Sequence, residues 1–188
     1  MTKIYLSVGA NIGDRAGNIR RAIAALAANR PVAPDTGRSP LPSGMGPGLR
    51  VTRVSSLYET EPVELLNQPW FLNCVVEAET EWKPQQVMDQ LLSIERGMGR
   101  ERSVPKGPRV IDVDILFFGS SLVHEAGLEI PHPRMAERRF VLVPFAEIAA
   151  GVRHPVLKKT IAELLAETTD QSVVRQWGQG NVTAEEHR

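Results

Sequence analysis

The chain has 188 residues, 42% of them hydrophobic and 5% aromatic, and its 22 basic residues balance its 22 acidic residues. The length suits one substantial core, and no apolar run approaches the ~20 residues that span a bilayer, so we expect a single domain that binds no membrane. The balanced charge and scarce aromatic residues argue against a nucleic-acid-binding protein, which needs a basic surface or stacking platforms.

The first predicted elements are a strand at residues 3–9 and a helix at residues 14–29. The strand follows Met1 without a basic leader or an apolar signal core, so we expect a cytoplasmic protein. Apolar residues recur at helical spacing in the helix, and Asp14 suits its N-cap. Residues 31–50 hold five Pro and four Gly without a regular period. They are therefore predicted to form an irregular insert.

Two strands flanking a long loop are predicted next, within residues 50–60 and 70–82. Cys74, the only cysteine, lies in the second strand and is expected to be a buried apolar residue. Pro84 suits the first turn of a second helix. Glu95 interrupts the apolar stripe of that helix, so we expect it on or beside the inward face.

The last predicted elements begin with a buried strand at residues 108–118, PRVIDVDILFF. A hairpin around residues 119–121, a loop plus helical segment in residues 130–149 and a short helix around residues 158–168 follow it. The tail, residues 168–188, shows little amphipathic pattern and is expected to fray, with the alternative that Val173, Val174 and Trp177 pack back.

The order strand, helix, strand, strand, helix, strand is that of the ferredoxin-like split βαβ arrangement. It predicts an α+β fold in which an antiparallel sheet carries helices on one face. We expect residues 1–167 to form this single domain.

Two acids, Asp112 and Asp114, interrupt the apolar strand at residues 108–118. Because side chains of a strand alternate, both acids point the same way, with Val110 and Leu116 and opposite Ile111, Val113, Ile115 and Phe117. Two residues of strand span roughly 6.6 Å, so both carboxylates can reach one cation or a pair of cations. The alternative interpretation is that the two acids face solvent on an edge strand and bind no metal.

A basic, glycine-containing run precedes the acidic strand and contributes Arg96, Arg100, Arg102, Lys106 and Arg109. Solvated surface charge explains many such runs. A divalent metal held by carboxylates and flanked by guanidinium groups, however, is what a polyphosphate requires.

His132 lies between two prolines and is followed by several arginines. A histidine in a turn is more often structural, but a fixed imidazole near cations could donate to a phosphate oxygen. The chain has no Walker loop. The residues thus indicate a Mg-dependent enzyme that handles a nucleoside polyphosphate, and they leave its second substrate open.

The chain resembles the 6-hydroxymethyl-7,8-dihydropterin pyrophosphokinases of folate biosynthesis. GPRVIDVDIL is similar to the family signature, and further motifs match in the same order: LSVGANIGD, SSLYETEPV, FLNCVVEAET, IERGMGR and IPHPRMAERRFVLVP. The resemblance implies a ferredoxin-like fold and an enzyme that transfers the pyrophosphoryl group of ATP to the pterin hydroxymethyl, releasing AMP.

The resemblance also implies a role for individual residues. Asp112 and Asp114 would hold two Mg²⁺ ions and, with Arg100 and Arg109, form the catalytic set. The residues implied for binding the nucleotide are Glu95, as a supporting acid, Arg102, Ile115, His132 and Arg138. Those implied for binding the pterin are Thr60, Val63, Phe71, Asn73 and Phe140.

Some positions depart from the family pattern. Many members carry a basic residue and an aromatic residue where this chain has Pro105 and Lys106, and some carry Tyr where it has Pro133. Residues 31–50 have no counterpart in the shorter members, and no residue stands out as a general base. We expect a monomer.

Two other classes of protein stay open as alternatives. A non-catalytic ferredoxin-like module would bind nucleotide or RNA, and its nucleotide binding would not depend on Mg²⁺. A palm-type nucleotidyl transferase would use the same two-metal logic but would release inorganic pyrophosphate instead of AMP.

Overall fold

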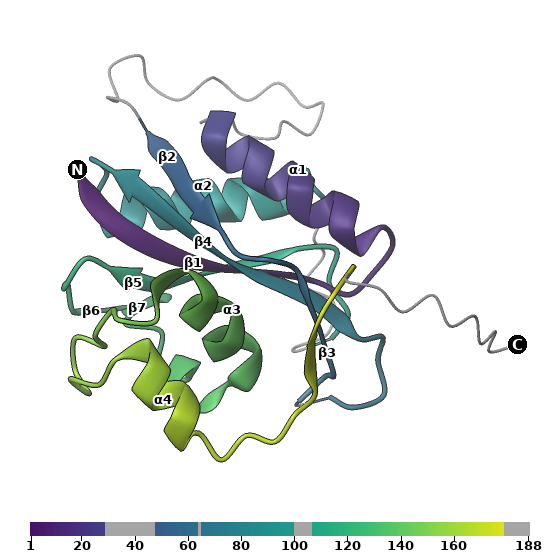
Figure 1. Ribbon diagram of the computed structural model, residues 1–188. Helices are drawn as coiled ribbons and strands as arrows, with labels where there is room; N and C mark the ends of the chain where they lie inside the picture. The colour runs from purple at the N-terminus through teal and green to yellow at the C-terminus, as the bar shows by residue number, and fades with distance from the viewer. Residues whose placement is uncertain (29–47, 64, 100–106, 179–188) are drawn as a thin grey trace, which may run out of the picture.

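A six-stranded sheet forms the centre of the computed structural model, which describes residues 1–28, 48–63, 65–99 and 107–178 (Figure 1). Its strands are β1 (Thr2–Ala10), β2 (Leu49–Val54), β3 (Tyr58–Thr60), β4 (Phe71–Thr80), β5 (Asp112–Phe118) and β8 (Val174–Gln176). The strand order is β5-β1-β4-β3-β8, β2 also pairs with β4, and the pairings are antiparallel. The predicted α+β fold with an antiparallel sheet is confirmed.

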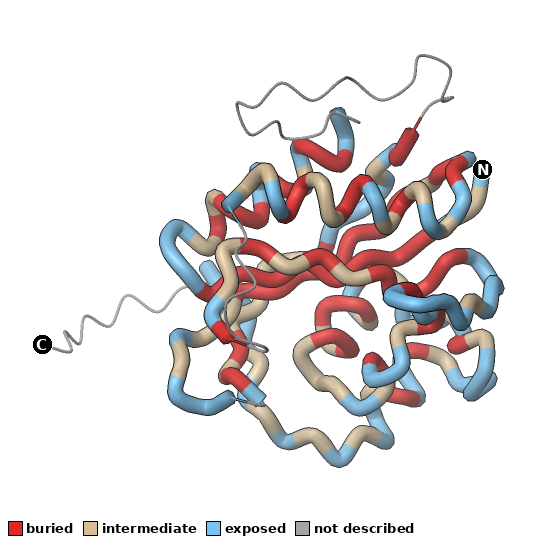
Figure 2. Tube along the Cα trace, turned by 180° about the vertical axis from the view of Figure 1, so that it is seen from behind, coloured by how far each residue is buried: buried red, intermediate tan, exposed pale blue. Residues whose placement is uncertain are grey.

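Helices pack on both faces of this sheet (Figure 1). One face carries α1 (Arg15–Ala28) and α2 (Pro84–Gly97), and the other carries α3 (Arg139–Ala149) and α4 (Ile161–Glu167). The prediction of helices on one face therefore holds for α1 and α2 and is wrong for α3 and α4. The physical reason is that the strands place apolar side chains on both faces, so both must be covered. Figure 2 shows the buried strands between the two layers.

A β-bulge in β5 places additional apolar residues against α3. Leu6 pairs with Ile115 and Tyr5 with Phe117, so Leu116 is an extra residue on β5. As a result, Leu116 and Phe117 both pack in the cluster around α3, where the ring of Phe145 lies 5.3 Å from that of Phe117. The expectation that Phe117 shares a face with Ile115 is wrong because a strict period of two does not cross a bulge.

Several predicted boundaries shift in the structure. The strand expected in residues 50–60 is two strands, β2 and β3, separated at Ser55, which exchanges hydrogen bonds with Val75. The hairpin expected around residues 119–121 lies further along, where β6 (Val123–Glu125) and β7 (Leu128–Ile130) form a separate two-stranded sheet. The helical segments in residues 130–149 are confirmed as a 3₁₀ turn, Met135–Glu137, and α3.

The short helix predicted near residue 160 is confirmed as α4, which begins with a reciprocal capping box. Thr160 Oγ1 accepts the amide N–H of Glu163 at 3.2 Å, and Glu163 Oε2 accepts that of Thr160 at 2.7 Å. Cys74 is buried, as expected, and burial raises the pKa of its thiol to about 12. It is therefore a packed side chain of β4 and not a nucleophile.

Part of the predicted tail forms a strand of the sheet. Val174–Gln176 forms β8 beside β3, and the amide of Trp177 donates to the carbonyl of Leu57 at 2.8 Å. The alternative that this segment packs back holds for its backbone, whereas the side chains of Val173 and Trp177 stay exposed. Of the predicted insert at residues 31–50, residues 31–47 lie outside the described residues, and Leu49 and Arg50 at its end belong to β2. Among the helices of the described residues, none is long and apolar enough to cross a membrane.

Candidate active site

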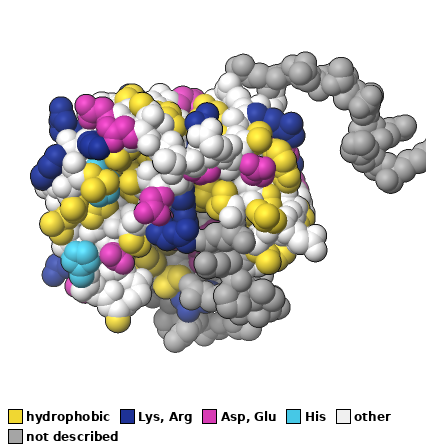
Figure 3. Space-filling model, turned by 90° about the horizontal axis from the view of Figure 1, so that it is seen from below, with side chains coloured by type: hydrophobic (Ala, Val, Ile, Leu, Met, Phe, Trp, Pro, Cys, Tyr) yellow, Lys and Arg dark blue, Asp and Glu magenta, His cyan; other side chains and the backbone are white. Residues whose placement is uncertain are grey.

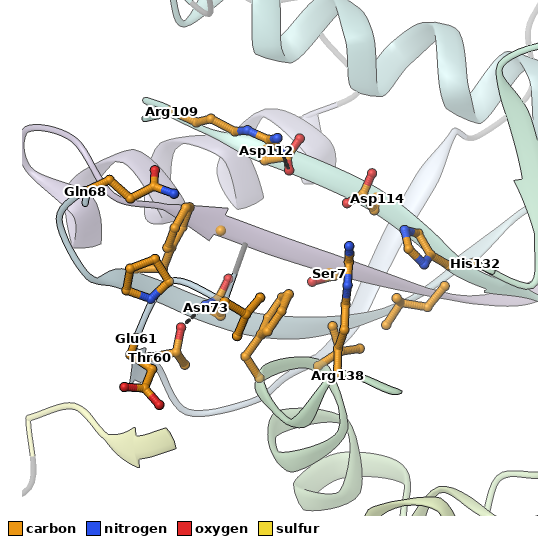
Figure 4. A pocket seen from close by; sticks show the side chains of 17 residues that line it. Ser7, Thr60, Glu61, Gln68, Asn73, Arg109, Asp112, Asp114, His132 and Arg138 are labelled. Atoms are coloured by element: carbon orange, nitrogen blue, oxygen red, sulfur yellow. Dashed lines mark hydrogen bonds and ion pairs between the residues drawn. The ribbon is translucent and has the colours of Figure 1, made fainter. Parts of the chain in front are cut away.

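An open pocket lies where β5, β1 and β4 meet the loop after β3 and the start of α3 (Figure 4). It encloses about 820 Å³, counting the space open to solvent. Its lining comprises Ser7, Gly9, Thr60, Glu61, Pro62, Val63, Gln68, Phe71, Asn73, Arg109, Asp112, Asp114, Leu116, His132, Arg138, Phe140 and Val141. Figure 4 shows Asp112, Asp114, His132 and Arg138 toward one end of this lining and Thr60, Glu61, Gln68 and Asn73 toward the other.

Asp112 and Asp114 stand side by side on β5 and both line the pocket (Figure 4). The adjacent strand β1 places Gly9 opposite Asp112 and Ser7 opposite Asp114, so small side chains lie beside the carboxylates. The structure thus brings the two acids to one face, as strand alternation predicts. Arg109 forms an ion pair with Asp112.

Asn11 fixes the backbone at Arg109 and is a residue that the sequence reasoning missed. Its side chain is 2% exposed. Asn11 Oδ1 accepts the amide of Arg109 at 2.7 Å, while Asn11 Nδ2 donates to Gln68 Oε1 and to the carbonyl of Pro69, both at 3.0 Å. Asn11 therefore joins the entry to β5 to the loop before β4. The signal in the sequence was the polar Asn in the Gly-rich turn after β1.

Glu95 supports the acidic strand from α2. It is 3% exposed, as its place in the helical stripe predicts, and its Oε1 accepts the amide N–H of Val113 at 2.8 Å. Val113 lies between the two aspartates on β5, at the edge of the sheet. Glu95 does not line the pocket, so its contact with β5 supports the site rather than a bound nucleotide.

His132 lines the pocket as a neutral imidazole. Burial, followed by the positive charges of Arg138 and Arg134, lowers the pKa of His132 to about 4, although Asp112 acts in the opposite direction. Nδ1 of His132 accepts the amide of Arg134 at 3.2 Å, so the neutral ring carries its proton on Nε2. A phosphate oxygen can accept a hydrogen bond from this N–H. Arg138 lines the same pocket, and its guanidinium carbon lies 5.7 Å from the ring centroid of Phe140.

The pocket lining also combines two aromatic residues with a fixed amide. Asn73, 4% exposed, donates from Nδ2 to Oγ1 of Thr60 at 2.7 Å. Phe71 and Phe140 also line the pocket, and Phe140 lies beside Arg138. All five residues expected here line the pocket, namely Thr60, Val63, Phe71, Asn73 and Phe140. Glu61, Pro62 and Gln68 also line it and were missed because they belong to a loop without a regular period.

Ile115 does not line this pocket, because alternation turns it toward α2, where it is 3% exposed. It lines a second pocket of about 580 Å³ between α2, β5 and the β6–β7 hairpin. The other residues of that pocket are Met88, Asp114, Glu125, Gly127, Leu128, Glu129, His132 and Pro133. Asp114 and His132 line both pockets, so the two spaces meet at these side chains.

Of the predicted basic run, Arg100, Arg102 and Lys106 lie outside the described residues, as does Pro105. Arg96 is exposed on α2 and donates from Nε to the carbonyl of Leu92 at 3.2 Å, and it does not line the pocket. Basic and acidic side chains are interspersed on the face in Figure 3, consistent with the balanced charge of the chain. Within the described part of the chain, no group of three or more His, Cys, Asp or Glu could by itself hold a metal ion. A cation at Asp112 and Asp114 would therefore need further oxygen ligands from water or from a bound phosphate.

Comparisons with known proteins match most of the chain. The family model described as 7,8-dihydro-6-hydroxymethylpterin-pyrophosphokinase matches residues 5–150. The chain is 39% identical to the 2-amino-4-hydroxy-6-hydroxymethyldihydropteridine pyrophosphokinase of Bacillus subtilis, over 93% of this chain and 90% of that protein. It is 38% identical to the protein of the same name from Methylorubrum extorquens, over 93% of this chain and 99% of that protein.

Longer proteins also contain a region similar to this chain. The chain is 34% identical to the folic acid synthesis protein fol1 of Pneumocystis carinii, but spans only 20% of it. The crystal structure of wild-type Plasmodium falciparum HPPK-DHPS matches with a TM-score of 0.63 at 16% identity, over 88% of this chain and 44% of that one. At this identity the structural match shows a shared fold.

Proposed function

Since the chain belongs to the 7,8-dihydro-6-hydroxymethylpterin-pyrophosphokinase family, we infer that it transfers the pyrophosphoryl group of ATP to 6-hydroxymethyl-7,8-dihydropterin in folate biosynthesis, with release of AMP. The observation that carries this inference is a pocket whose lining combines two carboxylates with two aromatic side chains and a fixed amide. The near full-length match to two bacterial relatives supports a single domain in residues 1–167.

The charged end of the pocket suits the phosphates of ATP. We propose that Asp112 and Asp114 hold two Mg²⁺ ions, because paired carboxylate oxygens are the hard ligands that this cation prefers. Mg²⁺ held by these two carboxylates would supply positive charge that offsets the negative charge of the phosphates. Arg109, Arg138 and the Nε2–H of His132 would contact the remaining phosphate oxygens. Arg100 and Arg102 stay predicted members of this set.

The two aromatic residues and the fixed amide suit the pterin. A flat heterocycle would stack between Phe71 and Phe140, with the amide of Asn73 on its polar edge. The hydrogen bond from Asn73 to Thr60 fixes the amide orientation, so the carbonyl oxygen is left to accept from the ring. Val63 would close the slot from the loop after β3.

The second pocket suits the nucleoside of ATP. Ile115 lines this space, and Asp114 and His132 lie at its junction with the first pocket. A nucleotide bound there would extend its phosphates past both side chains toward the pterin. The pterin hydroxymethyl oxygen would form a bond to the β-phosphorus and lose its proton to solvent. The bond between the β-phosphorus and the α–β bridging oxygen would break, and AMP would leave with that oxygen. Positioning and charge neutralisation would supply most of the acceleration, so a dedicated general base is not required.

The test is to incubate the protein with ATP, Mg²⁺ and 6-hydroxymethyl-7,8-dihydropterin and to identify the nucleotide product. AMP, formed only when the pterin is present, is expected. ADP or no turnover would contradict the proposal, while inorganic pyrophosphate would indicate a nucleotidyl transferase. Equal nucleotide binding with and without Mg²⁺ would favour the non-catalytic alternative. That the protein is a cytoplasmic monomer that binds neither nucleic acid nor membrane stays a prediction from the sequence.

A further inference from the structure

The C-terminal strand β8, yellow in Figure 1, extends the sheet beside β3. Val174 pairs with Thr60, and Arg175 pairs with Glu59. Thr60 lines the pocket, whereas no residue of β8 does. The strand therefore contacts the pocket wall from behind.

The residue before β8 also holds the pocket wall. The amide of Val173 donates to Glu61 Oε1 at 2.7 Å, and the amide of Glu61 donates to the carbonyl of Val173 at 3.3 Å. Glu61 lines the pocket directly after Thr60. A displacement of this C-terminal segment would therefore displace two consecutive pocket residues.

Glu59 binds two guanidinium groups that come from opposite ends of the chain. Arg175 donates to Glu59 Oε2 from Nε at 3.0 Å and from Nη2 at 2.6 Å, and Arg15 donates from Nη2 to Glu59 Oε1 at 2.9 Å. Partial burial acts to raise the pKa of Glu59, but the hydrogen bonds from the two arginines outweigh it and the pKa is lowered. The carboxylate thus stays ionised and ties β8 and α1 to β3.

Both arginines also contact Trp70, the residue before β4. Arg15 Nη1 donates to the carbonyl of Trp70 at 2.8 Å. The guanidinium carbon of Arg175 lies 5.0 Å from the centroid of the Trp70 ring, within the range of a cation–π contact. We call Glu59, Arg175, Arg15 and Trp70 the loop clamp.

The loop clamp holds together the two ends of the loop between β3 and β4. Glu59 lies one residue before Thr60, Trp70 lies one residue before Phe71, and Thr60 and Phe71 pair with each other across β3 and β4. Between these ends the loop exposes Val63 at 40% and Leu66 at 74%. A loop with such exposed apolar residues has little buried surface to fix its course, so contacts at its ends decide where it lies.

We propose that β8, acting through Arg175, is a positioning element for the pterin end of the pocket. The loop clamp holds Thr60, Glu61 and Phe71 in the arrangement that receives the heterocycle. Arg175 contacts Glu59 and Trp70 rather than the pocket, so it is a positioning residue and not a catalytic one. The proposal rests on the proposed function for the identity of the ligand.

The test replaces Arg175 with Gln, which removes the charge and the cation–π contact. The KM and the dissociation constant for 6-hydroxymethyl-7,8-dihydropterin should rise about three- to tenfold, while the KM for ATP stays within twofold. Arg175→Lys keeps the charge but not the planar fork, so it should restore part of the affinity. Amide hydrogen exchange should become faster in peptides that cover the loop between β3 and β4.

Arg50→Gln is the matched control. Arg50 lies opposite Glu79 in the pairing of β2 with β4 and forms an ion pair with it, as Arg175 does with Glu59. The two arginine side chains are similarly exposed, 67% and 63%. Arg50 and Glu79 do not line the pocket, so the control should leave pterin affinity and loop exchange unchanged.

Three results would overturn the proposal: unchanged pterin affinity and loop exchange in Arg175→Gln, equal losses of ATP and pterin affinity, or the same losses in Arg50→Gln. If Arg175→Gln does not fold, Trp70→Leu removes the stacked ring while keeping the main-chain contact with Arg15, and the same result is expected of it. A wild-type protein that forms no AMP would refute the proposed function instead, and loop exchange would still report on the clamp.

Discussion

The side-chain amide of Asn73 occupies the space that a side chain on Gly9 would need. The two residues pair across β1 and β4, and a Cβ at Gly9 would lie 2.5 Å from Oδ1 of Asn73. The absence of a side chain at residue 9 thus sets the position of the amide that we assign to the pterin.

Gly9→Ala should therefore weaken pterin binding. The added methyl group must displace the Asn73 side chain, which would lose its hydrogen bond with Thr60, so the pterin dissociation constant should rise about tenfold. Binding of a non-hydrolysable ATP analogue should change less than twofold. Ligand titrations measure both. Gly151→Ala is the control, because among the described residues no atom beyond the chain neighbours of Gly151 lies within 4 Å of a Cβ there. Unchanged pterin affinity in Gly9→Ala would show that Asn73 does not bind the ring.

Glu95→Ala should reduce both stability and turnover. The change leaves the amide of Val113 without the acceptor that the structure shows, and an unsatisfied buried donor costs about 1–3 kcal/mol of unfolding free energy. Turnover should fall as well, because Val113 lies between the two aspartates. Glu95→Gln retains an acceptor oxygen and should recover part of both losses. Urea denaturation and AMP formation measure the two effects.

The control for this prediction is Asp89→Ala, an acid on the same helix, whose side chain accepts from Gln85 at 2.9 Å on the exposed surface. It should change the unfolding free energy by less than about 0.5 kcal/mol. Equal losses in Glu95→Gln and Glu95→Ala would argue against the hydrogen bond as the cause.

The sequence predicts the acidic strand well because strand alternation is a local property. Asp112 and Asp114 share a face, and Glu95 is buried, as their spacing indicates. The bulge at Leu116 is not visible in the same pattern, since an extra residue on β5 is defined only by its pairing with β1. The burial of Phe117 against α3 was therefore not predicted.

Contacts between distant segments explain the other differences. Asn11 acts by meeting Arg109 and Gln68, which lie 98 and 57 residues away in sequence. The pairing of β8 with β3 likewise joins segments that are far apart, and the three residues of β8 carry no amphipathic pattern of their own. Such contacts depend on topology, so local periodicity cannot reveal them.

His154 should make the protein less stable in mild acid. Burial lowers the pKa of His154, its Nδ1 accepts the amides of Val156 and Leu157, and its ring packs edge-on to Phe117 at 5.3 Å. Because the unfolded chain binds this proton more readily than the folded one, the contribution of the neutral ring is complete above the unfolded pKa of about 6.5 and is lost as pH falls below it.

Urea denaturation at pH 7.5 and pH 5.5 measures this effect. The wild-type unfolding free energy should fall between the two values, and His154→Asn should show a smaller fall. His124→Asn serves as the control. His124 is exposed, and its Nδ1 lies 3.7 Å from Oε1 of the exposed residue Glu129. A fall of the same size in His154→Asn and wild type would exclude His154 as its source.

Asp112→Asn and Asp114→Asn should each lower the rate of AMP formation at least about 100-fold while leaving the fold intact, because an amide is a much poorer ligand for Mg²⁺ than a carboxylate.

The two variants should differ in how tightly they bind nucleotide when no metal is present. Asp112 forms an ion pair with Arg109, so Asp112→Asn releases this arginine toward the phosphates and should bind ATP in EDTA at least as tightly as wild type. Glu167→Gln, which removes a surface ion pair with Lys159, should leave turnover unchanged. Full activity in either aspartate variant would show that the phosphate-bridging cations are held elsewhere.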